Sequence, residues 1–586
     1  MKLFKRTHMC GELREENIGE NVVLNGWIQK RRNLGGLIFC DVRDKTGITQ
    51  VVFNDKIPEE LFNIADTLRS EYVVGISGKV MERESKNKDL PTGDIEVFAD
   101  DLVIYSQADT PPIYIKDDDN VDDNLRLKYR YLDLRKKKMQ DNLTFRHKLT
   151  KLARDYYSEC GFTEVETPML IKSTPEGARD YLVPSRVNQG HFYALPQSPQ
   201  TFKQLLMVGG TDRYMQIVKC FRDEDLRADR QPEFTQIDLE MSFVDTDDVI
   251  AIQEGFLKRV FEELKGVDIQ IPFPRMTYDE AMTRYGSDKP DTRFGFELQD
   301  ITDLVKECEF KVFTDAIAAG GSVRGICITD GAASYTRKKI DKLTESARSY
   351  GAKGMVWIKP GDGEIASSVN KFFSQEQMGE IVDRMGGKAG DLILIVSDKD
   401  KVVFDTLGFL RRHIAGELGL LDDNRYELLW VVDFPLFEYD EETDSYHAMH
   451  HPFTSPKEED AHLLKTEPEK AKANAYDIIL NGVELGGGSI RIHDREMQED
   501  MFRALKMSQE EIDEKFGFLV EAFKYGAPPH GGLAYGLDRL VMLLTGEKSI
   551  REVIAFPKNQ AAQCMVSEAP GIVDAEQLDE LGIKLK

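Results

Sequence analysis

The chain has 586 residues, of which 41% are hydrophobic and 31% are charged, and its formal net charge is −26 at pH 7. This length exceeds what one hydrophobic core supports, so it predicts three or four domains, and the composition excludes an intrinsically disordered chain. The sequence has no secretory signal pattern and no apolar run near the ~18 residues that cross a bilayer, so we expect no membrane attachment and a cytoplasmic location.

The acidic balance argues against nonspecific binding of nucleic acid, because Lys and Arg are needed to replace the counterions of a polyanion. Any RNA contact must therefore come from local basic clusters such as Lys30-Arg31-Arg32. The seven cysteines form no CxxC pair and no zinc-ligand set with histidine. We expect reduced thiols and no zinc.

Residues 1–108 contain short runs of β-favouring residues separated by turn signals, which predicts a small β-barrel. These runs lie at residues 22–27, 37–40, 48–53 and 73–80. An acidic segment at residues 116–123 predicts a solvated hinge, and a helical pattern follows over residues 124–160.

A second unit begins near Gly161, where the end of the helix is coupled to a strand that we expect to start at Pro168. Residues 214–244 then predict two strands joined by a charged loop. Alternation of side chains gives the second strand one apolar face and one polar face. The polar face consists of Phe234, Gln236, Asp238 and Glu240.

Two arginines, one in this stretch and one much later in the sequence, suit the binding of a nucleotide. Arg222 and Glu224 share one face at the exit of the first strand, where the guanidinium would hold a phosphate and the carboxylate an exocyclic amine. Phe234 offers a face for purine stacking. Arg539 follows a glycine-rich strand and opens an apolar helix, where an unpaired charge is costly, so it requires an anion.

Residues 286–425 mix helical and strand patterns with glycine-rich turns and carry no candidate chemistry, so they predict an inserted domain. Strand patterns return at residues 427–432 and 484–493. In the second of these, Ser489, Arg491 and His493 share a face beside a triple glycine.

Three of these segments resemble the signature motifs of class II aminoacyl-tRNA synthetases. They are the segment with Pro168, the run Phe221-Arg222-Asp223-Glu224 closed by Arg230 and Phe234, and the glycine-rich strand that leads to Arg539. Over essentially its whole length the chain is similar to the bacterial-type aspartyl-tRNA synthetase family. Further matching segments are residues 173–180, 197–203, 450–454 and 484–493.

The resemblance implies an α+β multidomain fold. It places an OB-fold anticodon-binding domain at residues 1–108 and a hinge at 109–135. It divides a class II antiparallel-sheet catalytic domain between residues 136–285 and 426–586, around a bacterial-type α+β insertion at 286–425. The β-barrel that the strand pattern predicts agrees with the first of these assignments.

The implied activity is that of an aspartate–tRNA ligase. Aspartate would react with ATP to give aspartyl-adenylate and diphosphate, and the aspartyl group would pass to the 3′ end of tRNA(Asp) with release of AMP. The implied partners are tRNA(Asp), ATP, L-aspartate and a second copy of the chain. Mg²⁺ would accompany ATP, since magnesium binds one or two carboxylates together with phosphate oxygens.

The resemblance also assigns site residues. Arg222 and Arg539 would be catalytic. The expected aspartate-binding residues are Glu176, Ser198, Gln200, Lys203, Arg222, Asp238, His450 and Arg491. The expected ATP-binding residues are Arg222, Asp223, Glu224, Gln231, Phe234, Glu484, Gly536, Leu537, Asp538 and Arg539. The expected Mg²⁺ ligands are Asp477 and Glu484, and the expected anticodon-binding residues are Arg32, Phe39, Gln50 and Glu96. Leu34 resembles the form specific for tRNA(Asp).

Several alternatives stay open at this level. A lysyl or asparaginyl ligase shares the domain plan, although lysine would require acidic residues where Lys203 and Arg491 stand. A noncatalytic RNA-binding relative would be expected to lack Arg222 or Arg539, and both are present. His451 competes with His450 as the aspartate contact. Phe39 competes as barrel core, and Asp477 as a carboxylate on a helix surface.

Overall fold

The computed structural model describes residues 3–117, 120–174, 177–226, 228–440 and 444–586. The chain divides into two compact units. Unit 1 comprises Met1–Thr150, Glu224–Pro232 and Val541–Lys586, and unit 2 comprises Lys151–Asp223 and Glu233–Leu540. No helix of the described residues is long and apolar enough to cross a membrane. The bounds of the five segments expected from the sequence stay predictions.

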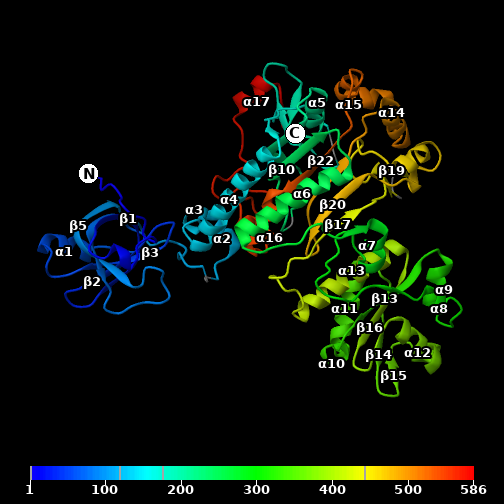
Figure 1. Ribbon diagram of the computed structural model, residues 1–586, viewed down its shortest axis with the longest axis horizontal. Coiled ribbons are helices and arrows are strands. Elements are labelled where there is room, and N and C mark those ends of the chain that lie inside the picture. The colour runs from blue at the N-terminus through cyan, green and yellow to red at the C-terminus, as the bar shows by residue number, and fades with distance from the viewer. Residues whose placement is uncertain (1–2, 118–119, 175–176, 227, 441–443) are drawn as a thin grey trace. The chain divides into compact units, whose positions relative to one another are not determined.

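Unit 1 contains a closed barrel with the strand order β1-β2-β3-β5-β4 (Figure 1). Buried and exposed side chains alternate along most of the first strand, as a barrel wall requires. The expected OB-fold is confirmed. Its elements are β1 (Asn21–Asn33), β2 (Ile38–Arg43), β3 (Ile48–Phe53), α1 (Glu59–Asp66), β4 (Val73–Glu82) and β5 (Ile95–Ser106).

The helical stretch after the barrel is three helices instead of the single one expected over residues 124–160. They are α2 (Asp123–Lys128), α3 (Arg130–Asp133) and α4 (Lys137–Glu159). The side chain of Asp122 caps the first of them by accepting from the N–H groups of Asn124 and Leu125. The helix α2 ends at Tyr129, whose φ of −102° and ψ of 39° are not helical. Unit 1 also contains α17 (Ala575–Leu581).

Unit 2 is built on an eight-stranded sheet with the order β11-β17-β20-β21-β22-β10-β9-β6 (Figure 1). All neighbouring strands are antiparallel except the pair at each edge. The antiparallel catalytic-type sheet is therefore confirmed. The strands are β6 (Thr163–Glu164), β9 (Arg213–Phe221), β10 (Glu233–Ser242), β11 (Arg275–Thr277), β17 (Leu428–Val432), β20 (Ala475–Leu480), β21 (Val483–Ile490) and β22 (His530–Gly536).

Helices and two small hairpins surround this sheet. The helices are α5 (Gln200–Val208), α6 (Thr246–Val260), α7 (Tyr278–Tyr285), α14 (Arg495–Ala504), α15 (Gln509–Phe523) and α16 (Leu537–Thr545). The hairpins pair β7 (Leu182–Pro184) with β8 (Phe192–Ala194) and β18 (Phe437–Asp440) with β19 (Ser445–Ala448). Figure 1 shows α6 lying along the sheet. Aromatic rings of Tyr157, Phe256 and Tyr535 join that helix to the sheet.

The prediction of a strand that starts at Pro168 is wrong. The strand in this segment, β6, lies before the proline, and Ile171 forms only an isolated bridge with Ala194. Val165 N donates the last main-chain hydrogen bond to the neighbouring strand, at Met215 O. Proline has no N–H with which to continue such a ladder.

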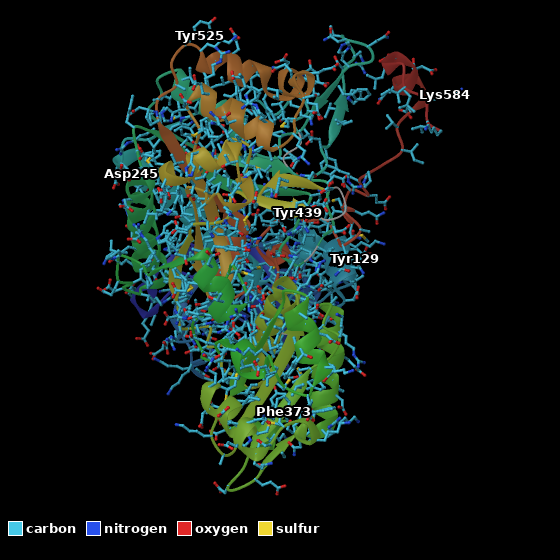
Figure 2. The ribbon with its side chains drawn as sticks, turned by 90° about the vertical axis from the view of Figure 1, so that its right-hand side faces the viewer. Tyr129, Asp245, Phe373, Tyr439, Tyr525 and Lys584 are labelled. Carbon is cyan, nitrogen blue, oxygen red and sulfur yellow. The ribbon has the colours of Figure 1, made fainter. Side chains whose placement is uncertain are left out.

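The inserted segment forms its own five-stranded sheet, in the order β12-β13-β16-β14-β15. Two separate hydrophobic clusters cover its faces. In Figure 2, Phe373 marks this end of unit 2 and Tyr525, just beyond α15, marks the opposite end. The elements are β12 (Gln299–Asp300), α8 (Thr302–Val305), α9 (Lys311–Ala318), β13 (Ser322–Ile328), α10 (Gly331–Ser334), α11 (Arg337–Ser349), β14 (Val356–Pro360), β15 (Ile365–Ser367), α12 (Gln375–Arg384), β16 (Leu392–Asp398) and α13 (Asp400–Glu417).

The two ends of the insertion are tied to each other. Arg293 Nη1 donates to Asp422 O at 3.0 Å, and Arg425 Nη1 donates to Arg293 O at 3.1 Å. The segment therefore leaves the eight-stranded sheet and returns to it at one place.

Candidate active site

A cluster of four buried charges lies on the central strands of unit 2. Lys203 Nζ on α5 lies 2.7 Å from Asp238 Oδ1 and 3.2 Å from Glu240 Oε2, both on β10. Arg491, just beyond β21, reaches the same glutamate with both edges of its fork, Nε to Oε1 at 2.9 Å and Nη2 to Oε2 at 3.1 Å. Arg491 Nη1 also donates to Ser489 Oγ at 2.7 Å. The structure thus brings together three predicted aspartate-binding residues.

These charges are stable in the interior only because they are paired. Burial alone would raise the pKa of Glu240, but Arg491 and Lys203 lower it to about 2. Burial raises the pKa of Asp238, which has Lys203 as its nearest cation and the like charge of Glu240 beside it. The formal charges of the four groups cancel.

Glycines make room for this cluster. A Cβ at Gly532 on β22 would lie 2.1 Å from Glu240 Oε2, and a Cβ at Gly488 would lie 1.9 Å from Gly532 O. Both distances are far below normal contact. Gly532 therefore leaves room for the Glu240 carboxylate, and Gly488 lets β21 lie close to the backbone of β22.

A second layer of polar groups supports the cluster. His530 is fully buried, and its Nδ1 lies 2.7 Å from Pro528 O while its Nε2 lies 3.1 Å from Gln204 Nε2. Nδ1 therefore carries the proton and Nε2 accepts. Burial lowers the pKa of His530, which agrees with a neutral ring.

Sequence reasoning assigned no role to Glu240, Gln204 or His530. The signal for Glu240 was its place on the polar face of its strand, next to Asp238. Gln204 and His530 are 326 positions apart in the chain, so no local pattern pointed to their contact.

The segment expected to fold over the amino acid is anchored at its base. Gln197 Nε2 donates to Ala178 O at 2.8 Å, and Ser173 Oγ donates to Asp180 Oδ2 at 2.7 Å. Glu176, the residue predicted to bind the ammonium group, lies outside the described residues. Of the other predicted aspartate contacts, Ser198 Oγ accepts from Gln200 N, and Gln200 Nε2 donates to Gln204 Oε1.

The predicted phosphate-binding arginines both lie in unit 2. The guanidinium of Arg222 lies 5.1 Å from the centre of the Phe234 ring. Arg539 Nη1 donates to Glu484 O at 3.0 Å. Asp538, another predicted ATP contact, accepts from Thr235 N at 2.8 Å and so ties α16 to β10.

Residues 224–226 and 228–232, which lie between β9 and β10 in the sequence, belong to unit 1 and are called the charged loop below. Within it, Arg230 Nη1 lies 3.0 Å from Glu224 Oε2. The side-chain amide of Gln231 bonds to the main chain of Lys558 in both directions, at 3.0 Å and 2.7 Å. That Glu224 and Gln231 contact ATP stays a prediction. Just before the loop, Asp223 N donates to Arg179 O within unit 2.

Two carboxylates on neighbouring strands fit a divalent cation. Asp477 lies on β20 and is buried, so its alternative as a helix-surface carboxylate is wrong. Burial and the neighbouring Asp477 raise the pKa of Glu484, whereas Lys289, 3.5 Å away, and Arg539 lower it. Two carboxylates that repel each other would gain from a shared Mg²⁺, which needs only one or two of them besides phosphate and water.

His450 lies beside this pair. Its Nε2 is 3.8 Å from Asp477 Oδ1, and its ring packs edge-on against Phe434 with the centres 4.8 Å apart. His451 Nδ1 instead accepts from Phe453 N at 3.3 Å. The choice between them as the aspartate contact stays a prediction.

The four predicted anticodon residues meet on the barrel of unit 1. Arg32 Nη2 donates to Gln50 Oε1 at 2.9 Å, and Gln50 Nε2 donates to Glu96 Oε2 at 2.7 Å. The Arg32 guanidinium lies 5.8 Å from the centre of the Phe39 ring. Phe39 is only half-buried and lies outside the barrel core, which disfavours its alternative as a core residue. Leu34 is exposed in the turn between β1 and β2.

The family of the chain follows from comparison with known proteins. The family model of tRNA synthetases class II (D, K and N) matches residues 122–560, and that of the OB-fold nucleic acid binding domain matches residues 22–105. The chain belongs to the class II tRNA synthetases. The family resemblance of the sequence is therefore confirmed. The matched residues, 122–560, include the buried charge cluster and both Arg222 and Arg539.

Curated relatives cover nearly the whole synthetase. It is 58% identical over 583 residues to the aspartate–tRNA(Asp/Asn) ligase of Caldanaerobacter subterraneus subsp. tengcongensis, covering 99% of this chain and 98% of that one. It is 57% identical over 581 residues to the aspartate–tRNA ligase of Clostridium perfringens, covering 99% and 97%. Among solved structures, asparaginyl-tRNA synthetase from Pyrococcus horikoshii complexed with asparaginyl-adenylate matches with a TM-score of 0.59 at 19% identity, covering 95% and 98%. This last likeness supports the fold alone.

Proposed function

We propose that this synthetase is an aspartate–tRNA ligase. It activates L-aspartate with ATP to aspartyl-adenylate, releasing diphosphate, and transfers the aspartyl group to the 3′ end of tRNA(Asp), releasing AMP. The observation that carries the proposal is the pairing of Lys203 and Arg491 on one buried glutamate. Arg491 has N–H groups beyond those that it gives to Glu240 and Ser489, which suits a substrate with a second carboxylate, whereas lysine would meet like charge there. Curated relatives at 57–58% identity carry the same activity in their names.

The reaction needs no protein nucleophile, because the aspartate carboxylate itself attacks the α-phosphorus. The protein's part is positioning and stabilisation of developing charge. Arg222 binds the α-phosphate, where negative charge grows during attack, and Arg539 holds the γ-phosphate. Phe234, which lies against the Arg222 guanidinium, stacks on the adenine.

Asp477 and Glu484 hold Mg²⁺ in this proposal. Their proximity and the raised pKa of Glu484 support it. When bound, the ion supplies positive charge to the phosphate oxygens of ATP. Lys289 Nζ, 3.5 Å from Glu484 Oε2, acts against that rise in pKa and favours the charged form of the carboxylate.

The barrel binds the anticodon of the tRNA, with Phe39 stacking on a base and Arg32, Gln50 and Glu96 hydrogen bonding to base edges. Leu34 favours tRNA(Asp) as the only substrate. The names of the relatives include both specificities, so tRNA(Asn) is the decisive comparison. We also propose that the enzyme is cytoplasmic and forms a homodimer. The homodimer is supported by the segment around Pro168, which resembles the class II signature motif that forms the dimer interface.

The test is aspartylation of purified tRNA(Asp) and tRNA(Asn) side by side, with lysine and asparagine as control amino acids. We expect charging of tRNA(Asp) with aspartate and none with the controls. Failure to charge either tRNA with aspartate would contradict the proposed function. Equal charging of both would contradict only the role of Leu34. The molar mass measured by light scattering during size-exclusion chromatography tests the homodimer.

A further inference from the structure

The charged loop is held by a stretch of the C-terminal part of unit 1, residues 549–558, called the C-terminal segment here. Ile550 N and Ser549 Oγ both donate to Ala228 O, at 3.1 Å and 3.0 Å. Together with the two bonds between Gln231 and Lys558, this makes four hydrogen bonds from segment to loop. The conformation of the loop therefore depends on the position of the C-terminal segment.

The C-terminal segment is held in turn by one buried arginine of α3. Arg130 is 1% exposed, and its guanidinium donates to the main-chain oxygens of Arg551, Ile554 and Ala555. Its Nη1 also donates to Asp133 Oδ2 at 2.7 Å. A guanidinium offers five N–H groups in a fixed planar fork, which lets one side chain hold a whole turn of backbone.

Neighbouring contacts hold the same segment by side chains. Arg126 reaches Glu552 with both Nη atoms, at 3.1 Å and 2.8 Å, and Asn142 Nδ2 donates to Glu552 O at 3.2 Å. Arg130 differs from these because it alone binds three main-chain oxygens. Asn142 and Arg146 each reach one main-chain oxygen of the segment, so Arg130 makes the most extensive of these contacts with its backbone.

We propose that Arg130 is a positioning residue for adenylate formation, which fixes the charged loop through the C-terminal segment without touching a substrate. The inference rests on the proposed function, because the loop carries the predicted ATP contacts Glu224 and Gln231. Loss of the Arg130 fork would leave the loop attached to a segment free to shift.

The test variant is Arg130→Lys in the full-length protein. Lysine keeps the charge and the pairing with Asp133 but cannot bridge three oxygens. We expect trypsin to cleave the loop at Arg230 about tenfold faster and the KM for ATP to rise about tenfold, the effect of losing one or two buried hydrogen bonds. The kcat of diphosphate exchange at saturating ATP should change less than KM.

Arg411 provides a matched control in the inserted domain. It is 2% exposed and also donates to three main-chain oxygens, those of Asp291, Gly295 and Phe296. Arg411→Lys should lower the melting temperature of unit 2 yet leave loop cleavage and the KM for ATP unchanged. If Arg130→Lys behaves like this control in both measurements, the proposal is overturned.

Ser549→Ala tests the same connection from the other side, because it removes the hydroxyl that donates to Ala228 O and accepts from Arg551 N. We expect the same direction of change, about threefold, and less than the product when it is combined with Arg130→Lys, because both act through one segment. Should Arg130→Lys fail to fold, an unchanged loop in Ser549→Ala overturns the proposal. Trypsin cleavage needs no activity, so it decides the matter even if the wild-type protein forms no aspartyl-adenylate.

Discussion

Glu240 is the single residue on which two cations of the candidate site depend. Glu240→Gln would leave Lys203 and Arg491 with one carboxylate, Asp238, between them. We expect the KM for aspartate to rise at least tenfold and the free energy of unfolding to fall by about 3 kcal/mol, as for other broken buried ion pairs. Diphosphate exchange at varied aspartate and urea unfolding measure the two effects. An unchanged KM for aspartate would contradict this role.

The same residue predicts a dependence of stability on pH. The pKa of Glu240 falls from its ordinary 4.5 to about 2 in the folded chain, so its carboxylate stabilises the fold above about pH 4.5. This contribution, on the order of 3 kcal/mol, is lost as the pH falls toward 2. The difference in unfolding free energy between wild type and Glu240→Gln should therefore shrink between pH 5 and pH 2. Burial raises the pKa of Asp238, so its contribution to the pH dependence of stability has the opposite sign.

Arg222 is expected to act in the reaction and not in the fold. Its guanidinium packs on Phe234, and removal of one charge that stabilises a transition state costs roughly 10²–10³ in kcat. We expect Arg222→Ala to lose diphosphate exchange by that factor while its melting temperature stays within 2 °C or about 0.5 kcal/mol of wild type. Lys219→Ala, an exposed position on β9 shortly before Arg222, is the control. Near-normal exchange in Arg222→Ala would refute the role.

At the scale of elements, the glycines of β22 set the spacing of the sheet. Gly532→Ala would place a Cβ 2.1 Å from both Glu240 Oε2 and Leu239 O. The strands must separate, so we expect a loss of about 3 kcal/mol in stability and weaker aspartate binding. Gly536→Ala, on the same strand, meets nothing closer than Arg539 Cβ at 3.7 Å and should cost less than about 1 kcal/mol. Equal losses in the two variants would contradict this reading of the sheet.

The elements that sequence reasoning predicted well are those with local patterns. Four of the five barrel strands follow turn signals and alternation, whereas β5 was not predicted. The polar face of β10 follows from a period of two. The break at Tyr129 and the early end of β6 were missed. The first depends on burying Arg130 against residues more than 420 positions away, and the second on the neighbouring strand at Met215.

For the candidate site, sequence identified the kinds of residues but not their pairing. Lys203, Asp238 and Arg491 were expected to bind substrate directly, and in the structure each also bonds to a protein group. Arg491 and Glu240 are 251 positions apart, so their contact is a property of the fold. Motifs report which charges are present, whereas packing decides which of them neutralise each other.

At the scale of the molecule, the insertion has the features of an independent folding unit. Both of its hydrophobic clusters consist of residues between 294 and 421, and Arg411 and Arg425 bond to carbonyls near its start. We expect residues 291–425 expressed alone to unfold cooperatively in urea, as single domains of this size do. Far-UV circular dichroism and tryptophan emission from Trp357 should give coincident transitions. A gradual, non-coincident loss of signal would contradict independence.

The hydrogen bonds among Arg293, Asp422 and Arg425 join the two ends of the insertion, and this has a consequence for the evolution and the engineering of the chain. Because entry and exit adjoin, the whole insertion could be gained or lost in a single genetic event without displacing the strands on either side. The same geometry marks a splice point. A foreign domain whose own termini lie close together could be grafted there, and the strands of the eight-stranded sheet would keep their positions as they do beside an ordinary turn.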